Sequence, residues 1–294
     1  MPKLEFPFFF ETKTLNAETR ANLPGDFIEL PDGFVHYELG GPEDGAPVVL
    51  VHGFSVPNYI WQPTFTALTA AGYRVLRYDL YGRGFSDRPH TRYNRALFDR
   101  QLLGLLDALG FTAPVNLFGL SMGGVISANF TASHPQRVAK LGLVDPAGFP
   151  LKLSMALQLV KIPGLGEMLF NLLGSKNLED SMLSDFYEPK HIKHFIKQYR
   201  PQMSYKGFKR ALLSTMRNRV LERGIDVYRQ VGQLDLPVLL VWGRQDVTVP
   251  FKYSADVVAA IPQVAFHPID SAGHIPHYER PEVVNPIILD FLRK

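Results

Sequence analysis

The sequence predicts an α/β protein, in which helices flank both faces of a mainly parallel, eight-stranded sheet and a helical cap is inserted after the sixth strand. Two observations favour this architecture. Short apolar runs alternate with segments of helical periodicity, as crossover connections between parallel strands require. One long stretch then interrupts the alternation, because residues 149–234 contain helical patterns and no convincing strand. The chain therefore divides into a core of residues 1–148 and 235–294 and a cap, or lid, of residues 149–234.

Each strand is predicted from an apolar run, since a parallel sheet covered on both faces needs strands that are apolar along their whole length. The first two strands flank the turn Pro31-Asp32-Gly33 and predict a hairpin. The eight predicted strands are 27–30, 34–39, 47–51, 74–78, 115–118, 139–144, 237–242 and 264–269. The predicted crossover helices are 61–71, 92–109, 124–134, 253–261 and 281–292, and the clearest cap helices are 153–161 and 188–199.

Composition excludes several classes of function. The formal net charge of +3 over 294 residues is small, and no nucleic-acid-binding motif accompanies it. The chain has no cysteine, which excludes disulfides and thiolate catalysis and fits a cytoplasmic location. No stretch reaches the ~18 uncharged apolar residues of a membrane span. The N-terminus lacks signal-peptide features, and the apolar residues 6–10 are expected to dock on the body of the protein rather than touch a membrane.

A Gly-Leu-Ser-Met-Gly pentapeptide, residues 119–123, follows the fifth predicted strand and precedes a predicted helix. Glycines two residues either side of a serine relieve the crowding of a sharp strand-to-helix turn, so Ser121 can present an exposed hydroxyl. The N-terminal amides of the helix favour negative charge beside it. The pattern predicts a nucleophile elbow that forms an acyl-enzyme.

A serine nucleophile needs a base, and the base needs an acid that orients it. His274 follows the last predicted strand on a glycine-containing loop, and it is favoured over His267 and His277. Asp246 follows the seventh predicted strand, whereas its rival Asp145 follows the sixth. The order serine, acid, histidine is that of an α/β-hydrolase triad. We therefore assign Ser121, Asp246 and His274 as catalytic residues.

Two backbone N–H groups should stabilise the oxyanion. Met122, directly after the nucleophile, supplies one, and Phe54 in the His52-Gly53-Phe54 loop supplies the other. His52 is expected to hold this loop by hydrogen bonding rather than act as base. Two further histidines, His191 and His194, share one face of a predicted helix but lack acidic partners, so no metal and no cofactor are expected.

With these pieces in place, residues 27–292 resemble the α/β-hydrolase superfamily. The segments that carry the resemblance, besides the elbow, are 52–54, 79–86, 243–246 and 273–274. Within 79–86, Asp79 and Arg83 are expected to fix a turn. The resemblance is to capped carboxylesterases, monoacylglycerol-lipase-like enzymes and the carbon–carbon hydrolases of aromatic breakdown. Those carbon–carbon hydrolases generally carry a tryptophan after the histidine and a Ser-Gly-Pro-Gly-like oxyanion loop, where this chain has Ile275 and Phe54-Ser55-Val56-Pro57.

The expected function is hydrolysis of short- to medium-chain apolar carboxylic esters through an acyl-enzyme on Ser121. Two alternatives stay open: hydrolysis of a carbon–carbon bond in a vinylogous diketone, and a ligand-binding protein that keeps the fold without catalysis. A homodimer also stays open. The cap decides the substrate, although its apolar residues serve equally well as pocket lining or as cap core. These residues are Met155, Leu159, Phe170, Phe186 and Phe208.

Overall fold

A computed structural model of the chain describes residues 8–150, 159, 161–188, 190 and 192–294. Its centre is one eight-stranded sheet with the strand order β1-β2-β4-β3-β5-β6-β7-β8. The first three strands in this order pair antiparallel, and every later pair is parallel. The strands are β1 Asp26–Leu30, β2 Gly33–Gly40, β3 Pro47–Val51, β4 Arg74–Tyr78, β5 Val115–Leu120, β6 Val138–Val144, β7 Val238–Gly243 and β8 Ala265–Ile269. All eight expected strands are present.

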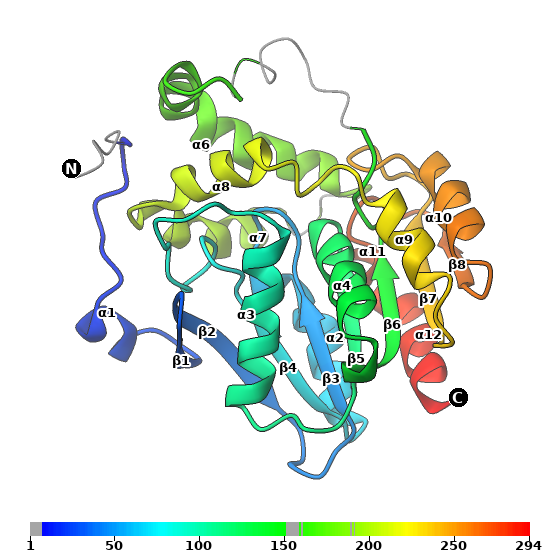
Figure 1. The fold of residues 1–294 in the computed structure, drawn as a ribbon. Coiled ribbons are helices and arrows are strands. Elements are labelled where there is room, and N and C mark those ends of the chain that lie inside the picture. Colours follow the sequence, from blue (N-terminus) through cyan, green and yellow to red (C-terminus); the bar gives the residue numbers. More distant parts are fainter. Residues whose placement is uncertain (1–7, 151–158, 160, 189, 191) are drawn as a thin grey trace.

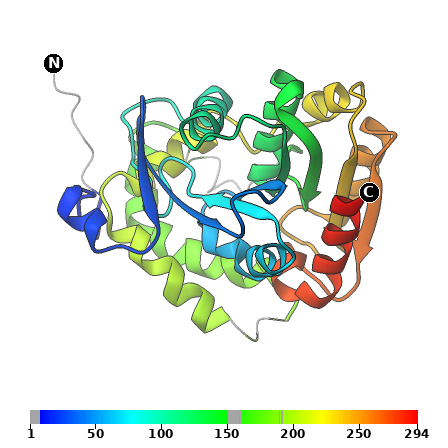
Figure 2. The ribbon, with the colours of Figure 1, turned by 90° about the horizontal axis from the view of Figure 1, so that it is seen from below.

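Helices cover both faces of this sheet, so the core has three layers (Figures 1 and 2). One face packs against α3 (Arg95–Ala108), α4 (Met122–Ser133), α9 (Ile225–Val231) and α10 (Ser254–Ala260). The other face packs against α2 (Gln62–Ala70), α11 (Pro276–Glu279) and α12 (Pro281–Arg293). Alternate residues of β3 go to opposite layers: Val49 and Val51 join the first, and Val48 and Leu50 the second. Two-sided burial explains why central strands such as β3 and β7 are continuously apolar.

Two of the crossover helices begin at residues that local chemistry selects. The helix expected from residue 92 begins at Arg95, because the Asn94 side chain accepts a hydrogen bond from Leu97 N–H at 3.0 Å and caps the first turn. The helix expected from residue 124 begins at Met122, directly after Ser121. The first turn of α4 therefore lies against the nucleophile.

Between β6 and β7 the chain forms the helical insertion, which lies over the sheet at the top of Figure 1. Its helices are α6 (Leu165–Asp185), α7 (Ile192–Tyr199) and α8 (Phe208–Arg217), followed by α9 on the core. The helix expected at 153–161 lies almost wholly outside the described residues, as does Met155. Of the other apolar residues named for the cap, Phe170, Phe186 and Phe208 join one buried cluster with the second sheet layer, whereas Leu159 is largely exposed.

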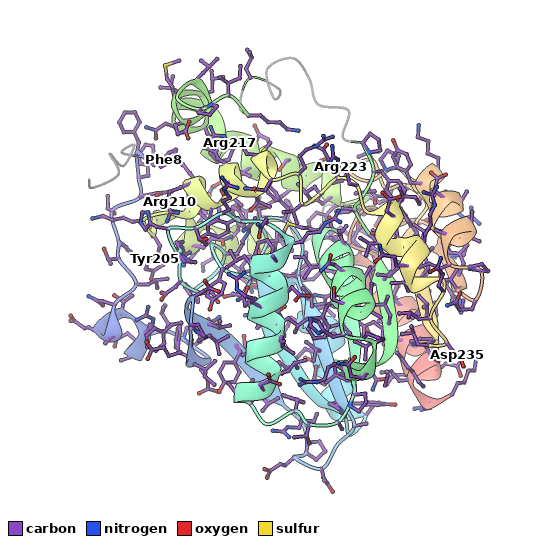
Figure 3. The ribbon with its side chains drawn as sticks, viewed as in Figure 1. Phe8, Tyr205, Arg210, Arg217, Arg223 and Asp235 are labelled. Atoms are coloured by element: carbon purple, nitrogen blue, oxygen red, sulfur yellow. The ribbon has the colours of Figure 1, made fainter. Side chains whose placement is uncertain are left out.

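The segment that begins at Phe8 docks on the cap. Phe9 N–H donates to the Asn171 side chain of α6, and Phe9 C=O accepts from Lys209 Nζ of α8 at 3.1 Å. Phe8 packs against the apolar cluster of the cap, and Figure 3 shows it on the same side of the molecule as Arg210 of α8. Residues 6 and 7 lie outside the described range.

Candidate functional site

Ser121 occupies a strained turn between β5 and α4. Its backbone lies at φ 53° and ψ −117°, a conformation that L-residues rarely adopt. The flanking glycines make the turn sterically feasible: a Cβ on Gly119 would lie 2.3 Å from Gly123 C=O, and a Cβ on Gly123 would lie 2.3 Å from Val51 C=O. This is the nucleophile-elbow geometry, and the strain is held by the packing of two backbone segments against each other.

The carboxyl ends of the neighbouring parallel strands bring an acid and a base to the same edge. His274, after β8, hydrogen-bonds through Nδ1 to Asp246 Oδ2 at 2.8 Å. The other carboxylate oxygen of Asp246 accepts the N–H groups of Thr248 at 2.8 Å and Val249 at 2.9 Å. Burial disfavours the charged imidazole, but Asp246 outweighs it and the pKa of His274 is raised. The geometry leaves Nε2 of His274 free of the Asp246 interaction.

A second carboxyl, that of Asp145, lies close to the His274–Asp246 pair. Asp145, after β6, is fully buried, and its Oδ1 accepts Gly243 N–H at 2.9 Å. Its Oδ2 has no hydrogen-bond partner among the described residues. Burial and the neighbouring Asp246 raise the pKa of Asp145 well above its usual value. Among the described residues the imidazole of His274 hydrogen-bonds the carboxyl of Asp246 and not that of Asp145.

The loop after β3 lies directly against Ser121. A Cβ on Gly53 would be 3.3 Å from Ser121 Cβ, so the glycine permits this close approach. His52 holds the loop: its Nε2 accepts Leu80 N–H at 2.9 Å, and burial lowers its pKa to about 4. Because this imidazole is neutral and both of its nitrogens are hydrogen-bonded, His52 has a structural role. The N–H groups of Phe54 and Met122 belong to the two segments that meet at Ser121.

Arg83 supports the same loop from behind. Its side chain is fully buried, and Nε–H donates to Phe54 C=O at 2.8 Å. The remaining donors go to Tyr81 C=O at 3.1 Å and to Thr215 Oγ1 of α8 at 2.8 Å. No carboxylate pairs with it in the described part of the chain, and burial lowers its pKa to about 9. Arg83 thus joins the His52-Gly53-Phe54 loop to α8 in the cap.

Asp79, at the end of β4, fixes the turn that carries Arg83, as the sequence analysis expects. Its carboxylate accepts the N–H groups of Asn58 and Phe85, each at 2.9 Å, and the imidazole of His36 at 2.7 Å. Burial alone would raise the pKa of Asp79, but His36 and the N–H donors lower it. The buried ion-pair network therefore stabilises the site loops rather than taking part in chemistry.

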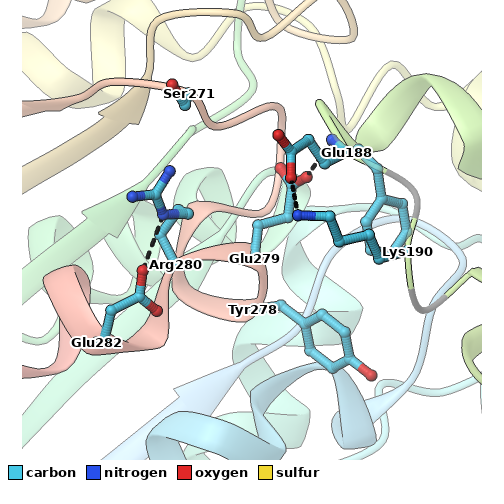
Figure 4. Close-up of a pocket in the computed structure, with 8 residues that line it drawn as sticks. Glu188, Lys190, Ser271, Tyr278, Glu279, Arg280 and Glu282 are labelled. Atoms are coloured by element: carbon cyan, nitrogen blue, oxygen red, sulfur yellow. Dashed lines mark hydrogen bonds and ion pairs between the residues drawn. The ribbon is translucent and has the colours of Figure 1, made fainter.

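Sequence reasoning misses two acids where the cap contacts the histidine loop. Asp185, the last residue of α6, accepts His274 N–H with its backbone carbonyl at 2.8 Å. Glu279 of α11 accepts the N–H groups of Gly273, Tyr187 and Glu188, and Figure 4 shows it beside Glu188 in a surface pocket. No local pattern marks either acid, because their partners are distant in sequence.

One group of side chains has the arrangement of potential metal ligands among the described residues: Asp145, Asp246 and His274, whose ligand atoms lie within 4.8 Å of one another. Because His274 Nδ1 and Asp246 Oδ2 already hydrogen-bond each other, this group is better described as an acid–base pair with an additional carboxyl. Of the two histidines considered for a metal, His191 lies outside the described residues. His194 is on the exposed face of α7, where it contacts the Gln198 side chain.

Comparison with known proteins places this geometry in a family. The family model of the alpha/beta hydrolase fold matches residues 46–281, and the chain belongs to this family. A 2-hydroxy-6-oxo-6-phenylhexa-2,4-dienoate hydrolase from Comamonas testosteroni is 29% identical over 90% of this chain and 93% of its own length. The enzyme of that name from Burkholderia cepacia is 30% identical over 86% of this chain and 90% of its own.

Solved structures agree on the fold. A thermophilic esterase from Thermogutta terrifontis superposes with a TM-score of 0.77 at 24% identity, covering 92% of this chain and 98% of the esterase. The chain is therefore a hydrolase of the alpha/beta hydrolase fold, in agreement with the expected class. None of the helices in the described ranges combines the length and apolarity that crossing a membrane requires.

Proposed function

We propose that this chain is a serine hydrolase in which Ser121 attacks a substrate carbonyl and becomes acylated. The observation that carries the proposal is the strained elbow of Ser121 at the sheet edge that also holds the His274–Asp246 hydrogen bond of 2.8 Å. His274 accepts the serine proton through Nε2 while Asp246 holds the imidazole by Nδ1 and stabilises its positive charge. The N–H groups of Met122 and Phe54 stabilise the oxyanion.

Acylation ends when His274 gives its proton to the leaving group as the bond to the acyl carbon breaks. Water then attacks the acyl-enzyme while His274 removes a proton from it. The bond between the acyl carbon and Ser121 Oγ breaks, His274 returns the proton to Oγ, and the acid product departs. This sequence accommodates an oxygen or a carbon leaving group, because the enzyme supplies the same proton in both cases. A carbon leaving group departs readily only when its negative charge is delocalised.

For the substrate class, we favour a carbon–carbon bond in a 2-hydroxy-6-oxo-dienoate. The names of the two curated relatives above specify such a substrate, and both alignments cover nearly the whole of this chain. The conjugated dienoate can delocalise the charge left by the departing carbon. This ranking reverses the expectation of simple ester hydrolysis from the sequence analysis.

Ester hydrolysis remains the second candidate because two segments of the site differ from the pattern of the carbon–carbon hydrolases. Ile275, which follows His274, is a buried apolar residue where those enzymes generally have tryptophan. The oxyanion loop reads Phe54-Ser55-Val56-Pro57 rather than a glycine-rich sequence. These two departures from the carbon–carbon hydrolase pattern keep an acyl ester as the second substrate class.

A two-substrate comparison tests these proposals. The purified chain is assayed with 2-hydroxy-6-oxo-6-phenylhexa-2,4-dienoate and with p-nitrophenyl butyrate, next to Ser121→Ala and the matched control Ser133→Ala at the exposed end of α4. A higher kcat/KM for the dienoate supports carbon–carbon hydrolysis, and a higher value for the ester supports the second candidate. Turnover that survives in Ser121→Ala, or a wild type that a fluorophosphonate cannot label, would refute the serine mechanism.

A further inference from the structure

Asp185, at the end of α6 in the cap, hydrogen-bonds both the loop that carries His274 and the loop that carries Asp246. Asp185 C=O accepts the N–H of His274 at 2.8 Å. The Asp185 carboxylate accepts the hydroxyl of Thr248 at 2.7 Å, and Thr248 N–H in turn donates to Asp246 Oδ1 at 2.8 Å. A single residue at the end of α6 thus connects the cap to the loops of His274 and Asp246.

We propose that Asp185 is a positioning residue of the catalytic site, which aligns His274 with Asp246 and adds negative charge beside the imidazole. The inference rests on the serine-hydrolase function proposed above. It extends that function to the cap, because the cap becomes part of the device that sets the geometry and basicity of the base. A displacement of about 1 Å in such a device can cost ~100-fold in rate.

Close contacts hold the end of α6 against the loop that carries His274. A Cβ on Gly273 would lie 2.5 Å from Asp185 C=O and 2.9 Å from Tyr187 N, so only glycine lets the cap approach this closely. Glu279 then connects the two segments: Oε2 accepts Gly273 N–H at 2.7 Å, and Oε1 accepts the N–H groups of Tyr187 at 2.8 Å and Glu188 at 3.0 Å. Figure 4 shows Glu279 between the histidine loop and the cap.

The titratable groups near His274 are the carboxyls of Asp246, Asp185 and Asp145 and the imidazole of His277. Asp246 and Asp185 favour the imidazolium and raise the pKa of His274 against the effect of burial. The carboxyl of Asp145 lies within 4.8 Å of the pair, and His277 of α11 interacts electrostatically with His274. Removing the charge at Asp185 while keeping its shape is therefore expected to lower the pKa of His274, whereas a purely structural residue would leave it unchanged.

Fluorophosphonate labelling of Ser121 in the full chain, measured from pH 5 to 8, tests this inference without knowledge of the substrate. The key variant is Asp185→Asn. Asp180→Asn, on the exposed side of the same helix, is the matched control. In Asp185→Asn we expect the acid limb of the labelling rate to move down by about half a pH unit or more and the rate at pH 8 to fall by about tenfold. Asp180→Asn should behave as wild type.

A second variant separates alignment from charge. Thr248→Val removes the hydroxyl that Asp185 accepts but leaves the Asp185 charge, so we expect a severalfold lower labelling rate with the acid limb at the wild-type pH. It also decides the question if Asp185→Asn does not fold, as judged by thermal unfolding. Identical profiles for Asp185→Asn and Asp180→Asn, or an unchanged rate in Thr248→Val, would overturn the positioning role alone. An unlabelled wild type would refute the serine-hydrolase function as well.

Discussion

Asp145 and Asp246 lie side by side at the carboxyl ends of β6 and β7, yet only Asp246 hydrogen-bonds His274, at 2.8 Å from Oδ2 to Nδ1. Both carboxyls are buried, and the two negative charges cannot both be stable at this separation. Burial and the neighbouring Asp246 raise the pKa of Asp145 well above its usual value, so Asp145 keeps its proton to a higher pH than an exposed aspartate does. The two acids therefore have different roles, because Asp246 is the one that hydrogen-bonds the imidazole.

This division predicts opposite outcomes for two equivalent substitutions. Asp246→Asn removes the charge that holds the His274 tautomer and should lower kcat/KM by ~10³-fold or more. Asp145→Asn replaces the carboxyl by an amide of the same shape that can still accept Gly243 N–H, and it leaves the Asp246–His274 hydrogen bond in place, so activity should stay within about tenfold of wild type. Steady-state kinetics on either substrate measures both effects. A larger loss in Asp145→Asn than in Asp246→Asn would exchange the roles of the two acids.

Glycine substitutions should separate crowding from conformational entropy. In Gly123→Ala the new Cβ would lie 2.3 Å from Val51 C=O and 2.5 Å from His52 C=O. Because backbone cannot move aside cheaply, we expect a loss of about 3 kcal/mol or more in the free energy of unfolding. Gly104→Ala, in the middle of α3, makes only ordinary contacts, at 3.6 Å from Leu30, and should stabilise by about 0.5–1 kcal/mol. Urea unfolding followed by circular dichroism measures the two values, and similar values would contradict the steric argument.

His277 should make the protein sensitive to acid. Its ring is fully buried against Trp61, with centroids 4.2 Å apart, and burial lowers its pKa to about 3 from the usual 6.5. Below pH 6.5 the imidazole of His277 is protonated in the unfolded chain, whereas in the folded chain it stays neutral down to about pH 3. The free energy of unfolding therefore falls as the pH falls through this window. At pH 5 this single group costs about 2 kcal/mol.

Glutamine at position 277 cannot take up a proton in either the folded or the unfolded chain. Between pH 7 and pH 5, His277→Gln should lose about 2 kcal/mol less of its unfolding free energy than wild type. The exposed His267 provides the control, and His267→Gln should show the wild-type loss. The measurement is urea unfolding at the two pH values. An equal loss in His277→Gln and wild type would mean that the buried ring accepts a proton without cost.

Substitution of Arg83 should impair catalysis rather than substrate binding. Lysine keeps the positive charge but cannot satisfy the acceptors Phe54 C=O, Tyr81 C=O and Thr215 Oγ1 together. We expect Arg83→Lys to lower kcat by ~10–100-fold with KM within about threefold of wild type, because the oxyanion N–H of Phe54 loses its alignment. The exposed Arg92→Lys is the control. A change in KM alone would point to a role of Arg83 in substrate binding.

Much of the fold is predictable from local patterns in this chain. Continuous apolar runs locate the central strands such as β3, β5 and β7, which are buried on both faces, and the turn at Pro31-Asp32-Gly33 locates the hairpin of β1 and β2. The Asn94 cap and the glycines around Ser121 account for where α3 and α4 begin. The same patterns do not specify the spatial strand order, in which β4 lies between β2 and β3, because that order depends on how helices cross the sheet.

Some features of the site are likewise predictable from the sequence, and others are not. By itself, the sequence determined that Ser121 lies on a tight strand-to-helix turn and that Asp145, Asp246 and His274 follow strands whose ends share one edge. Only the tertiary structure decided that Asp246 contacts the imidazole and that Asp145 is left with a buried, unpartnered oxygen. It also brought Asp185 and Glu279 to the histidine loop. Turn chemistry and hydrophobic periodicity act over a few neighbouring residues, whereas these contacts join segments that meet only when the cap packs on the core.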